Sequence, residues 1–385
     1  MAFINREREL AALEAMWQRE GAQLMVVYGR RRTGKTALLH AFTQDKPTVF
    51  WTAEITSATN LLRSFSRTLW DYANPQAPAS EDFAFGSWEQ ALRYTGQIAE
   101  DKRVAVVLDE FPYLAGAQPG IPSLLQRLWD ERLGQTNLFL VLCGSHIGMM
   151  EREVLAYRAP LYGRRTGQLL LRPLSFSAAR QFFPRYSPVQ QVTAYAVLGG
   201  TPGYLQQFTD RQPIAANIEE RILTPTSFLY YEPQFLLQTE LRDPRNYMAI
   251  LQAIATGHNR LADICRAAGI DRGQASRSLA TLRDLHLVER RVPATERQPE
   301  KSRKGRYLLR DNFLRFWFRF VLPFQEFLDL GRTDRARKTV EDQLPAFVAR
   351  AFEDLCREWV LVEGDEGRLP FYPERVGAWW GPGAE

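Results

Sequence analysis

Cysteine and histidine are scarce in this chain of 385 residues, which has three of the first and four of the second. Cys143, Cys265 and Cys356 lie far apart and form no Cys-x-x-Cys pair, and the histidines have no zinc-binding spacing. We therefore expect neither a disulfide framework nor a structural zinc site. The chain also lacks a run of about 18 apolar residues and a signal peptide, so we expect no membrane span and a reducing, cytoplasmic location.

An excess of one charge sign is also weak, because the net charge is only +5. This value permits a nucleic-acid partner without specifying one. Hydrophobic residues make up 45% and aromatic residues 12% of the chain, which argues against a disordered protein. The length suffices for about two to three domains.

The first informative motif is a glycine-containing segment at residues 29–36, which follows an apolar run and precedes a helical pattern. Gly29, four further residues and then Gly34-Lys35-Thr36 form the P-loop pattern, in which backbone N–H groups surround phosphates. Lysine reaches the β- and γ-phosphates in this motif and threonine binds Mg²⁺, so we expect ATP and Mg²⁺ as cofactors. An ordinary glycine-bearing turn is the alternative. The candidate nucleotide-binding residues of this segment are Gly29, Arg30, Arg31, Arg32, Thr33, Gly34, Lys35 and Thr36.

A second motif consists of an apolar run that ends in two acids. Residues 104–108 predict a strand buried in a parallel sheet, and Asp109 and Glu110 follow at its carboxyl end, where ligands bind in such sheets. We expect Asp109 to hold Mg²⁺ and Glu110 to orient or deprotonate the attacking water. The alternative for Glu110 is a solvated carboxylate at a strand end.

Two neighbouring arginines, Arg164 and Arg165, are further catalytic candidates. They could stabilise developing phosphate charge, either within one chain or across a subunit interface, or they could be plain surface residues. At the other end of this region, Asn5 is the expected N-cap of an amphipathic helix that runs to Trp17.

From residue 244 the pattern predicts three short helices followed by a β-hairpin, which is a winged helix-turn-helix. We expect Gly269 to end the second helix, Asp271 to cap the third, and residues 287–292 and 306–309 to form the hairpin. The wing is rich in arginine and lysine, which favours duplex DNA as a partner, although winged helices also bind proteins. The candidate DNA-binding residues are Arg272, Gln274, Arg277, Arg303 and Lys304.

Together these segments resemble the archaeal-type P-loop ATPases of the STAND/AAA superfamily, which also occur in bacteria. The resemblance covers most of residues 1–240 and implies that the segment 3–10 lies near the adenine. It further implies that Ser145, after the strand at 138–144, senses the γ-phosphate, with a helix N-cap as the alternative, and that Pro202 lies in a turn near the base. The matching stretches are 3–10, 29–36, 104–110, 144–145, 160–165 and 199–204.

The aromatic stretch 311–324, expected to be a buried helix, also marks this family, whose members continue into a domain like that of PD-(D/E)xK nucleases. The resemblance implies a first helix at 345–360, with Pro345 in its first turn, and a strand at 371–380. Only Glu353 matches a metal-binding position, because the Asp and the Glu-x-Lys should follow beyond the end of the sequence. We therefore expect a truncated domain without nuclease activity.

The sequence thus predicts an α/β protein with a P-loop NTPase parallel sheet, an AAA-like helical subdomain, a winged helix-turn-helix and a truncated α/β C-terminal segment. The expected domains are 1–172, 173–243, 244–325 and 326–385. The expected function is that of an ATP-driven switch, a Mg²⁺-dependent ATPase coupled to the winged helix. The alternatives are a nucleotide-regulated DNA-binding protein or a protein-interaction scaffold with little turnover, with DNA, another protein or a second copy as partner.

Overall fold

The structure, a computed structural model, describes residues 4–241 and 243–380. The chain divides into two units, Met1–Arg172 and Pro173–Glu385. Each unit has its own core and is described by itself. None of the described helices is long and apolar enough to cross a membrane.

The first unit is built on a parallel sheet, in which the described strands have the order β2-β3-β4-β1-β5. The P-loop strand β1 therefore does not adjoin β3, the strand that ends in the two acids, because β4 pairs with both. This arrangement confirms the predicted parallel α/β fold. The strands are β1 (Gln23–Tyr28), β2 (Thr48–Thr52), β3 (Val104–Asp109), β4 (Leu138–Gly144) and β5 (Gly167–Leu170).

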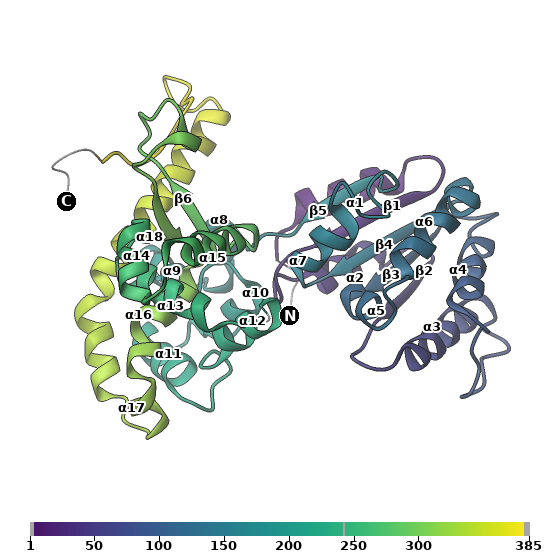
Figure 1. Cartoon of the computed structure of the whole chain (residues 1–385), viewed down its shortest axis with the longest axis horizontal. Coiled ribbons are helices and arrows are strands. Elements are labelled where there is room, and N and C mark those ends of the chain that lie inside the picture. Colours follow the sequence, from purple (N-terminus) through teal and green to yellow (C-terminus); the bar gives the residue numbers. More distant parts are fainter. Residues whose placement is uncertain (1–3, 242, 381–385) are drawn as a thin grey trace. The chain divides into compact units, whose positions relative to one another are not determined.

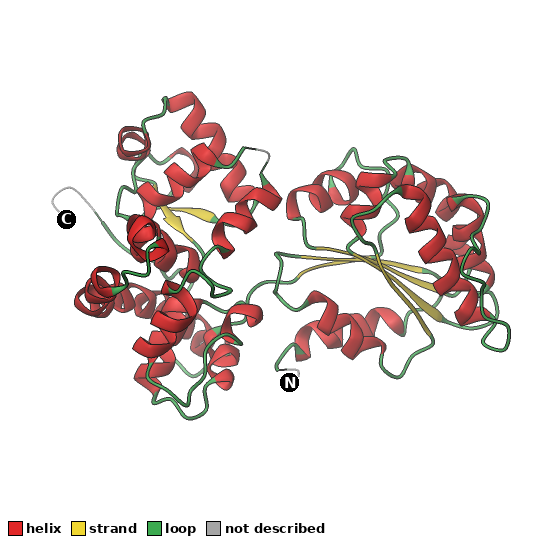
Figure 2. Cartoon of the chain, turned by 90° about the horizontal axis from the view of Figure 1, so that it is seen from below, coloured by secondary structure: helices red, strands yellow, loops and turns green. Residues whose placement is uncertain are grey.

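Helices cover both faces of this sheet (Figures 1 and 2). Successive side chains of a strand point to opposite faces. Val26 accordingly packs with the core under α3 to α6, and Val27 packs with the core under α1 and α2. The helices of this unit are α1 (Glu7–Trp17), α2 (Lys35–Thr43), α3 (Ala58–Ala73), α4 (Trp88–Gln97), α5 (Phe111–Ala117), α6 (Ile121–Glu131) and α7 (Ile147–Met150). Shorter helical turns follow at Leu133–Gln135 and Glu151–Leu155.

The second unit is helical apart from the hairpin of β6 (Val288–Arg291) and β7 (Arg306–Leu309). Its first helices are α8 (Phe176–Ala179), α9 (Pro188–Leu198), α10 (Pro202–Leu205), α11 (Ile214–Ile218) and α12 (Glu232–Glu240). The winged-helix region contains α13 (Arg245–Ala255), α14 (Leu261–Ala268) and α15 (Arg272–Asp284), and the chain continues through α16 (Asn312–Phe320), α17 (Gln325–Asp329) and α18 (Asp334–Asp365). Single 3-10 turns occur at Arg180–Phe182, Pro299–Lys301 and Leu322–Phe324, and a π-helical turn at Glu219–Leu223.

Local signals in the winged helix act as predicted. Gly269 ends α14 with a φ of 66°, a left-handed conformation that glycine adopts at little cost. The carboxylate of Asp271 accepts a hydrogen bond from the backbone N–H of Gln274 and so caps α15. The aromatic helix α16 is buried as expected, and the Nε1 atom of its Trp317 donates to the carbonyl of Tyr230 at 2.6 Å.

Three predictions of local structure are wrong. The N-cap of α1 is Arg6 rather than Asn5, whose side chain instead accepts from the backbone N–H of Arg6. Pro345 is not in a first turn, because α18 begins 11 residues earlier, at Asp334, and continues through the proline. The described residues 371–380 form no strand, since no neighbouring strand is there to pair with them in the described part of the chain. Phe3 and the residues after Trp380 lie outside the described residues.

Candidate functional site

The P-loop connects β1 to α2 and folds back on itself. The hydroxyl of Thr33 and the Nζ atom of Lys35 both donate to the carbonyl of Arg30, at 2.8 and 2.9 Å. Gly34 has a φ of 92° and Arg32 one of 66°, so the backbone turns through the left-handed region twice. A Cβ at Gly29 would collide with the carbonyl of Leu171, which explains the first glycine of the motif by packing.

The acidic end of β3 meets the P-loop at the start of α2. The hydroxyl of Thr36 donates to Oδ2 of Asp109 at 2.7 Å, and Asp109 is 1% exposed. A hydroxyl and a carboxylate at this distance offer the hard oxygen ligands that Mg²⁺ prefers, and Mg²⁺ usually takes its other ligands from water and phosphate oxygens. The chemistry of the pair fits a magnesium ion that phosphate and water also ligate. Residues 4–241 and 243–380 contain no group of three or more His, Cys, Asp or Glu suited to a metal.

Glu110 is the N-cap of α5 and has a strained backbone conformation. Its φ of 51° and ψ of 41° are left-handed, a conformation that costs a non-glycine residue about 1–3 kcal/mol and is often found at functional sites. Its carboxylate Oε2 accepts from the hydroxyl of Ser145 at 2.8 Å and from the backbone N–H of Ser145 at 3.3 Å. Ser145 is not a helix cap, because His146 caps α7 through its Nδ1 atom.

The order of the strands explains how these groups meet. The strand β4 lies between β1 and β3, so its carboxyl end brings Ser145 between the P-loop and the two acids. Gly144 precedes it in a tight place, where a Cβ would lie 2.6 Å from the Met150 sulfur and 2.7 Å from Pro112. One edge of the sheet thus gathers Lys35, Thr36, Asp109, Glu110 and Ser145.

Two residues of this site were missed from the sequence. Arg6, which is 6% exposed, donates from Nη2 to the carbonyls of Thr33, at 3.1 Å, and Arg172, at 2.7 Å. The thiol of Cys143 is fully buried on β4 beside Asp109, and burial, followed by the charge of Asp109, raises its pKa well above the ordinary value. Only the position of Cys143 just before Gly144-Ser145 could have indicated its place.

The two candidate arginines have partners elsewhere in the first unit. Arg164 forms a bidentate ion pair with Asp130 of α6 at 3.1 and 2.8 Å, and this contact holds the pKa of Asp130 below its ordinary value. Arg165 donates to the carbonyl of Leu155 at 3.0 Å and lies over the ring of Tyr162. Their catalytic role stays a prediction.

The remaining candidate residues lie in the second unit. Pro202 begins α10, after a turn in which Gly199 has a φ of 67° and the carbonyl of Gly200 accepts from the N–H of Leu174. Its approach to a base stays a prediction. The candidate DNA-binding side chains Arg272, Arg277, Arg303 and Lys304 are exposed on α15 and the wing, and Gln274 is half-buried.

Glu353, the residue at the nuclease-like position, lies on α18. Its carboxylate forms an ion pair with Arg357 at 3.1 Å.

The sheet order, the P-loop and the acid at the end of β3 define the class of P-loop NTPase domains. Residues 3–208 match a family described as an ATPase domain predominantly from Archaea, and the chain belongs to this family. Residues 246–291 match the IclR helix-turn-helix domain. Residues 317–385 match a family of archaeal and bacterial proteins of unknown function.

Similar proteins and structures are known. An uncharacterized protein of Methanocaldococcus jannaschii is 33% identical over 383 residues, which cover 100% of this chain and 83% of the relative. The Walker-type ATPase of Pyrococcus abyssi is similar in structure, with a TM-score of 0.62 and 22% identity over 82% of this chain and 96% of that one. The ORC2 protein of Aeropyrum pernix, solved in ADPNP–ADP complexes, gives a TM-score of 0.50 and 14% identity over 90% of this chain and 96% of that one. At these identities the two structures show the fold alone.

Proposed function

We propose that this protein is a Mg²⁺-dependent ATPase of the STAND/AAA superfamily, and that its nucleotide state acts as a switch on the winged-helix module. The observation that carries the proposal is the 2.7 Å hydrogen bond between Thr36 and Asp109. It joins the P-loop and the acidic strand end, two motifs distant in sequence, into one site. The ATPase family to which residues 3–208 belong supports the same conclusion.

Each residue of this site has a defined part in the proposal. The P-loop amides and Lys35 bind the phosphates, and Lys35 exchanges the carbonyl of Arg30 for phosphate oxygens. Thr36 and Asp109 hold Mg²⁺, which when bound neutralises charge on the phosphate oxygens. Since Asp109 is almost fully buried, its carboxylate keeps one orientation toward Thr36.

Glu110 is the proposed base, and Ser145 is the residue that positions it. The carboxylate of Glu110 is fixed by two hydrogen bonds from Ser145, so one side of the group is oriented by the end of β4. Its remaining lone pairs can accept a proton from a water molecule aligned for attack. Loss of a positioned general base costs typically about 10²–10⁴-fold in rate.

ATP turnover by three variants tests this proposal. We expect Lys35→Ala to weaken ATP binding by about 10- to 100-fold, because the variant cannot donate a charged hydrogen bond to the phosphates. We expect Glu110→Gln to bind ATP as the wild type does but to turn it over at least about 10²-fold more slowly. The control is Glu54→Gln, an exposed carboxylate beyond the end of β2. Equal turnover by all four proteins would contradict the ATPase assignment.

The exposed cations of α15 and the wing favour duplex DNA as the partner of the module, in agreement with the helix-turn-helix match. We expect binding to fall with salt, and Arg303→Glu with Lys304→Glu to lower the slope of log affinity against log salt by about one for each phosphate that the variant no longer neutralises. The control is Arg245→Glu, an exposed arginine at the start of the three helices. No retention on DNA at low salt would favour the protein-interaction alternative.

We infer no nuclease activity for the segment 326–385, although its likeness to a nuclease-like domain stays part of the proposal. Mg²⁺-dependent cleavage needs several carboxylates around the metal. The carboxylate of Glu353 is instead engaged by Arg357. Cleavage of duplex DNA by the purified chain in Mg²⁺, abolished by Glu353→Gln, would contradict this inference.

A further inference from the structure

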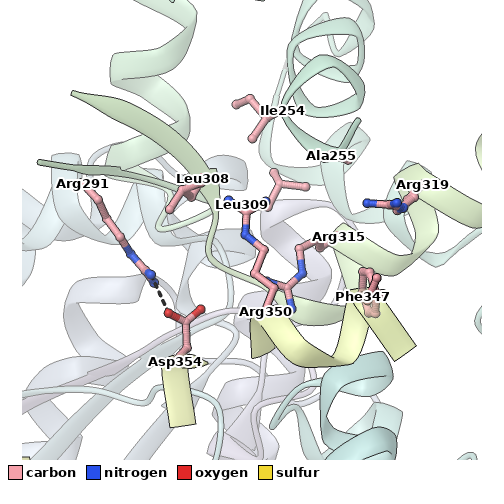
Figure 3. Close-up of a pocket in the computed structure, with 11 residues that line it drawn as sticks. Ile254, Ala255, Arg291, Leu308, Leu309, Arg315, Arg319, Phe347, Arg350 and Asp354 are labelled. Atoms are coloured by element: carbon pink, nitrogen blue, oxygen red, sulfur yellow. Dashed lines mark hydrogen bonds and ion pairs between the residues drawn. The ribbon is translucent and has the colours of Figure 1, made fainter. Parts of the chain in front are cut away.

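A cavity of about 40 Å³ in the second unit is lined by four arginines and one carboxylate (Figure 3). The winged helix contributes the end of α13 and the β6–β7 hairpin with Arg291, α16 contributes Arg315 and Arg319, and α18 contributes Arg350 and Asp354. The guanidinium groups of Arg315 and Arg350 converge in this view, beside the ion pair of Arg291 and Asp354. No sequence motif pointed to this cluster, because its members come from elements up to 63 residues apart.

Arg315 is the centre of the cluster and is 7% exposed. Within the described part of the chain, its Nε and Nη2 atoms have no hydrogen-bond partner, although both are buried. Its guanidinium lies 4.9 Å from the ring centroid of Phe347, a contact that supplies no acceptor. A buried cation with unmade hydrogen bonds is costly, so its presence calls for a further group.

The other charges around the cavity leave the positive charge in excess. The one lining carboxylate, Asp354, is shared by Arg291 at 2.5 Å and Arg357 at 2.6 Å. Arg319 donates to Gln343, which is neutral. Asp311 and Glu353 attract the cluster from nearby without lining the cavity, and Glu289 pairs with Arg291. The lining side chains thus present four guanidinium groups to one carboxylate.

Burial and the crowding of positive charge lower the pKa values of two arginines in the cluster. Burial, together with repulsion from Arg350, lowers the pKa of Arg315 to about 10. Burial likewise lowers the pKa of Arg350, and repulsion from Arg291 adds to the effect. An arginine guanidinium keeps its proton in proteins at neutral pH, so the cavity keeps its positive charge.

We propose that this cavity binds a phosphate-type oxyanion, held by Arg315 and Arg350 at the junction of the winged helix, α16 and α18. The forked guanidinium donors match the oxygens of phosphate and form strong charge-assisted hydrogen bonds with them. One water molecule needs about 10–15 Å³ of such cavity volume, so this cavity has room for a group of a few atoms and not for a nucleotide. The side chain of Arg350 is partly exposed although its surroundings desolvate the guanidinium, so the oxyanion is either free phosphate or the phosphate group of a larger monoester whose remainder extends into solvent on this side.

Calorimetric titration with inorganic phosphate, at ionic strength matched with chloride, tests the proposal on the full chain. The full chain used in this titration carries Lys35→Ala, which weakens the proposed phosphate site of the P-loop and so keeps the two proposals separate. We expect one bound phosphate per chain and, in thermal unfolding, a folding constant raised about 100-fold at 100 times the dissociation constant. Glycerol 3-phosphate forms the second arm: binding equal to that of phosphate indicates a monoester, and weaker binding indicates free phosphate.

Two variants of the cluster complete the test. Arg315→Met is expected to abolish phosphate binding and to raise the unfolding temperature without phosphate, because it removes the uncompensated charge. Arg350→Gln, an exposed position, carries the test if Arg315→Met does not fold, and is expected to weaken binding at least tenfold. The control is Arg337→Gln, a half-exposed arginine of the same helix α18. The proposal would be overturned if the Lys35→Ala chain bound no phosphate. It would also be overturned if Arg315→Met and Arg350→Gln, introduced into that chain, left its phosphate affinity unchanged.

Discussion

Thr36 and Asp109 are 73 residues apart in the sequence, and a single hydrogen bond of 2.7 Å brings their motifs together. The chemistry of each residue could be predicted, because the P-loop pattern is specific and gives meaning to the acid-ended strand that follows it, a pattern that is common by itself. The contact itself could not, because it depends on the place of β4 in the sheet. The same strand order brings Ser145 to Glu110. From the sequence alone, Ser145 could be either a γ-phosphate sensor or a helix N-cap.

Replacement of Thr36 by the isosteric valine tests the metal-binding pair. In the wild type we expect EDTA to weaken ATP binding by about 10- to 100-fold, because the oxygen ligands lose their ion. In Thr36→Val we expect weak binding already in Mg²⁺ and little further effect of EDTA. Fluorescence titration with a labelled ATP analogue measures both. Thr52→Val, at the exposed end of β2, is the matched control, and an unchanged response to EDTA in Thr36→Val would contradict the assignment.

The thiol of Cys143 gives a second prediction at this scale. Burial raises its pKa well above the ordinary value and so disfavours the thiolate, which is the reactive form. We expect a thiol reagent to label the exposed Cys356 quickly in the native protein and Cys143 only after unfolding in urea. Cys356→Ser should remove the fast phase. A native protein in which all three thiols react at the same rate would contradict the burial of Cys143.

At the scale of elements, the sequence predicted the structure well where residues close in sequence determine it. Gly269 and Asp271 set the ends of α14 and α15 through their own backbone and side-chain chemistry. The prediction failed where tertiary packing decides. Pro345 was expected at a helix start, yet α18 runs through it, since the buried Val340 and Phe347 on either side anchor one continuous helix. The strand expected at 371–380 has no partner among the described residues.

The cap of α15 has a pH dependence whose sign follows from its contact. Hydrogen bonds from the backbone N–H groups of Gln274 and Gly273 lower the pKa of Asp271 in the folded state. Its stabilising effect is therefore complete above the pKa of the unfolded chain and is lost as the pH falls through the folded pKa. We expect Asp271→Ala to lower the urea midpoint more at pH 7 than at the acidic end of a pH series, where only a neutral cap is lost. Asp271→Ser keeps a cap that does not ionise. If its urea midpoint depended on pH as strongly as that of the wild type, ionisation of Asp271 would not be the cause.

At the scale of the whole molecule, a switch requires that ATP and DNA affect each other. Linkage makes the effect reciprocal: a factor by which ATP changes DNA affinity must equal the factor by which DNA changes ATP affinity. We expect a factor of about 5–150, the usual range for coupled sites. Glu110→Gln, expected to hold ATP without turnover, allows both factors to be measured at equilibrium by fluorescence anisotropy.

Lys35→Ala is the control for this coupling, because its DNA affinity should not change at ATP concentrations that saturate Glu110→Gln but lie below the dissociation constant of the weakened variant. If the two factors in Glu110→Gln are both close to one, the protein binds two ligands without a switch, and the coupling part of the proposal fails.

The guanidinium of Arg6 has a mechanical consequence. One nitrogen atom, Nη2, uses its two hydrogens on two carbonyls, that of Thr33 in the P-loop and that of Arg172, the last residue of the first unit. Because both carbonyls share this nitrogen, a large shift of either peptide moves the guanidinium with it or breaks one of the two hydrogen bonds. A rearrangement of the phosphate loop therefore reaches, through a single atom, the peptide after which the second half of the molecule begins.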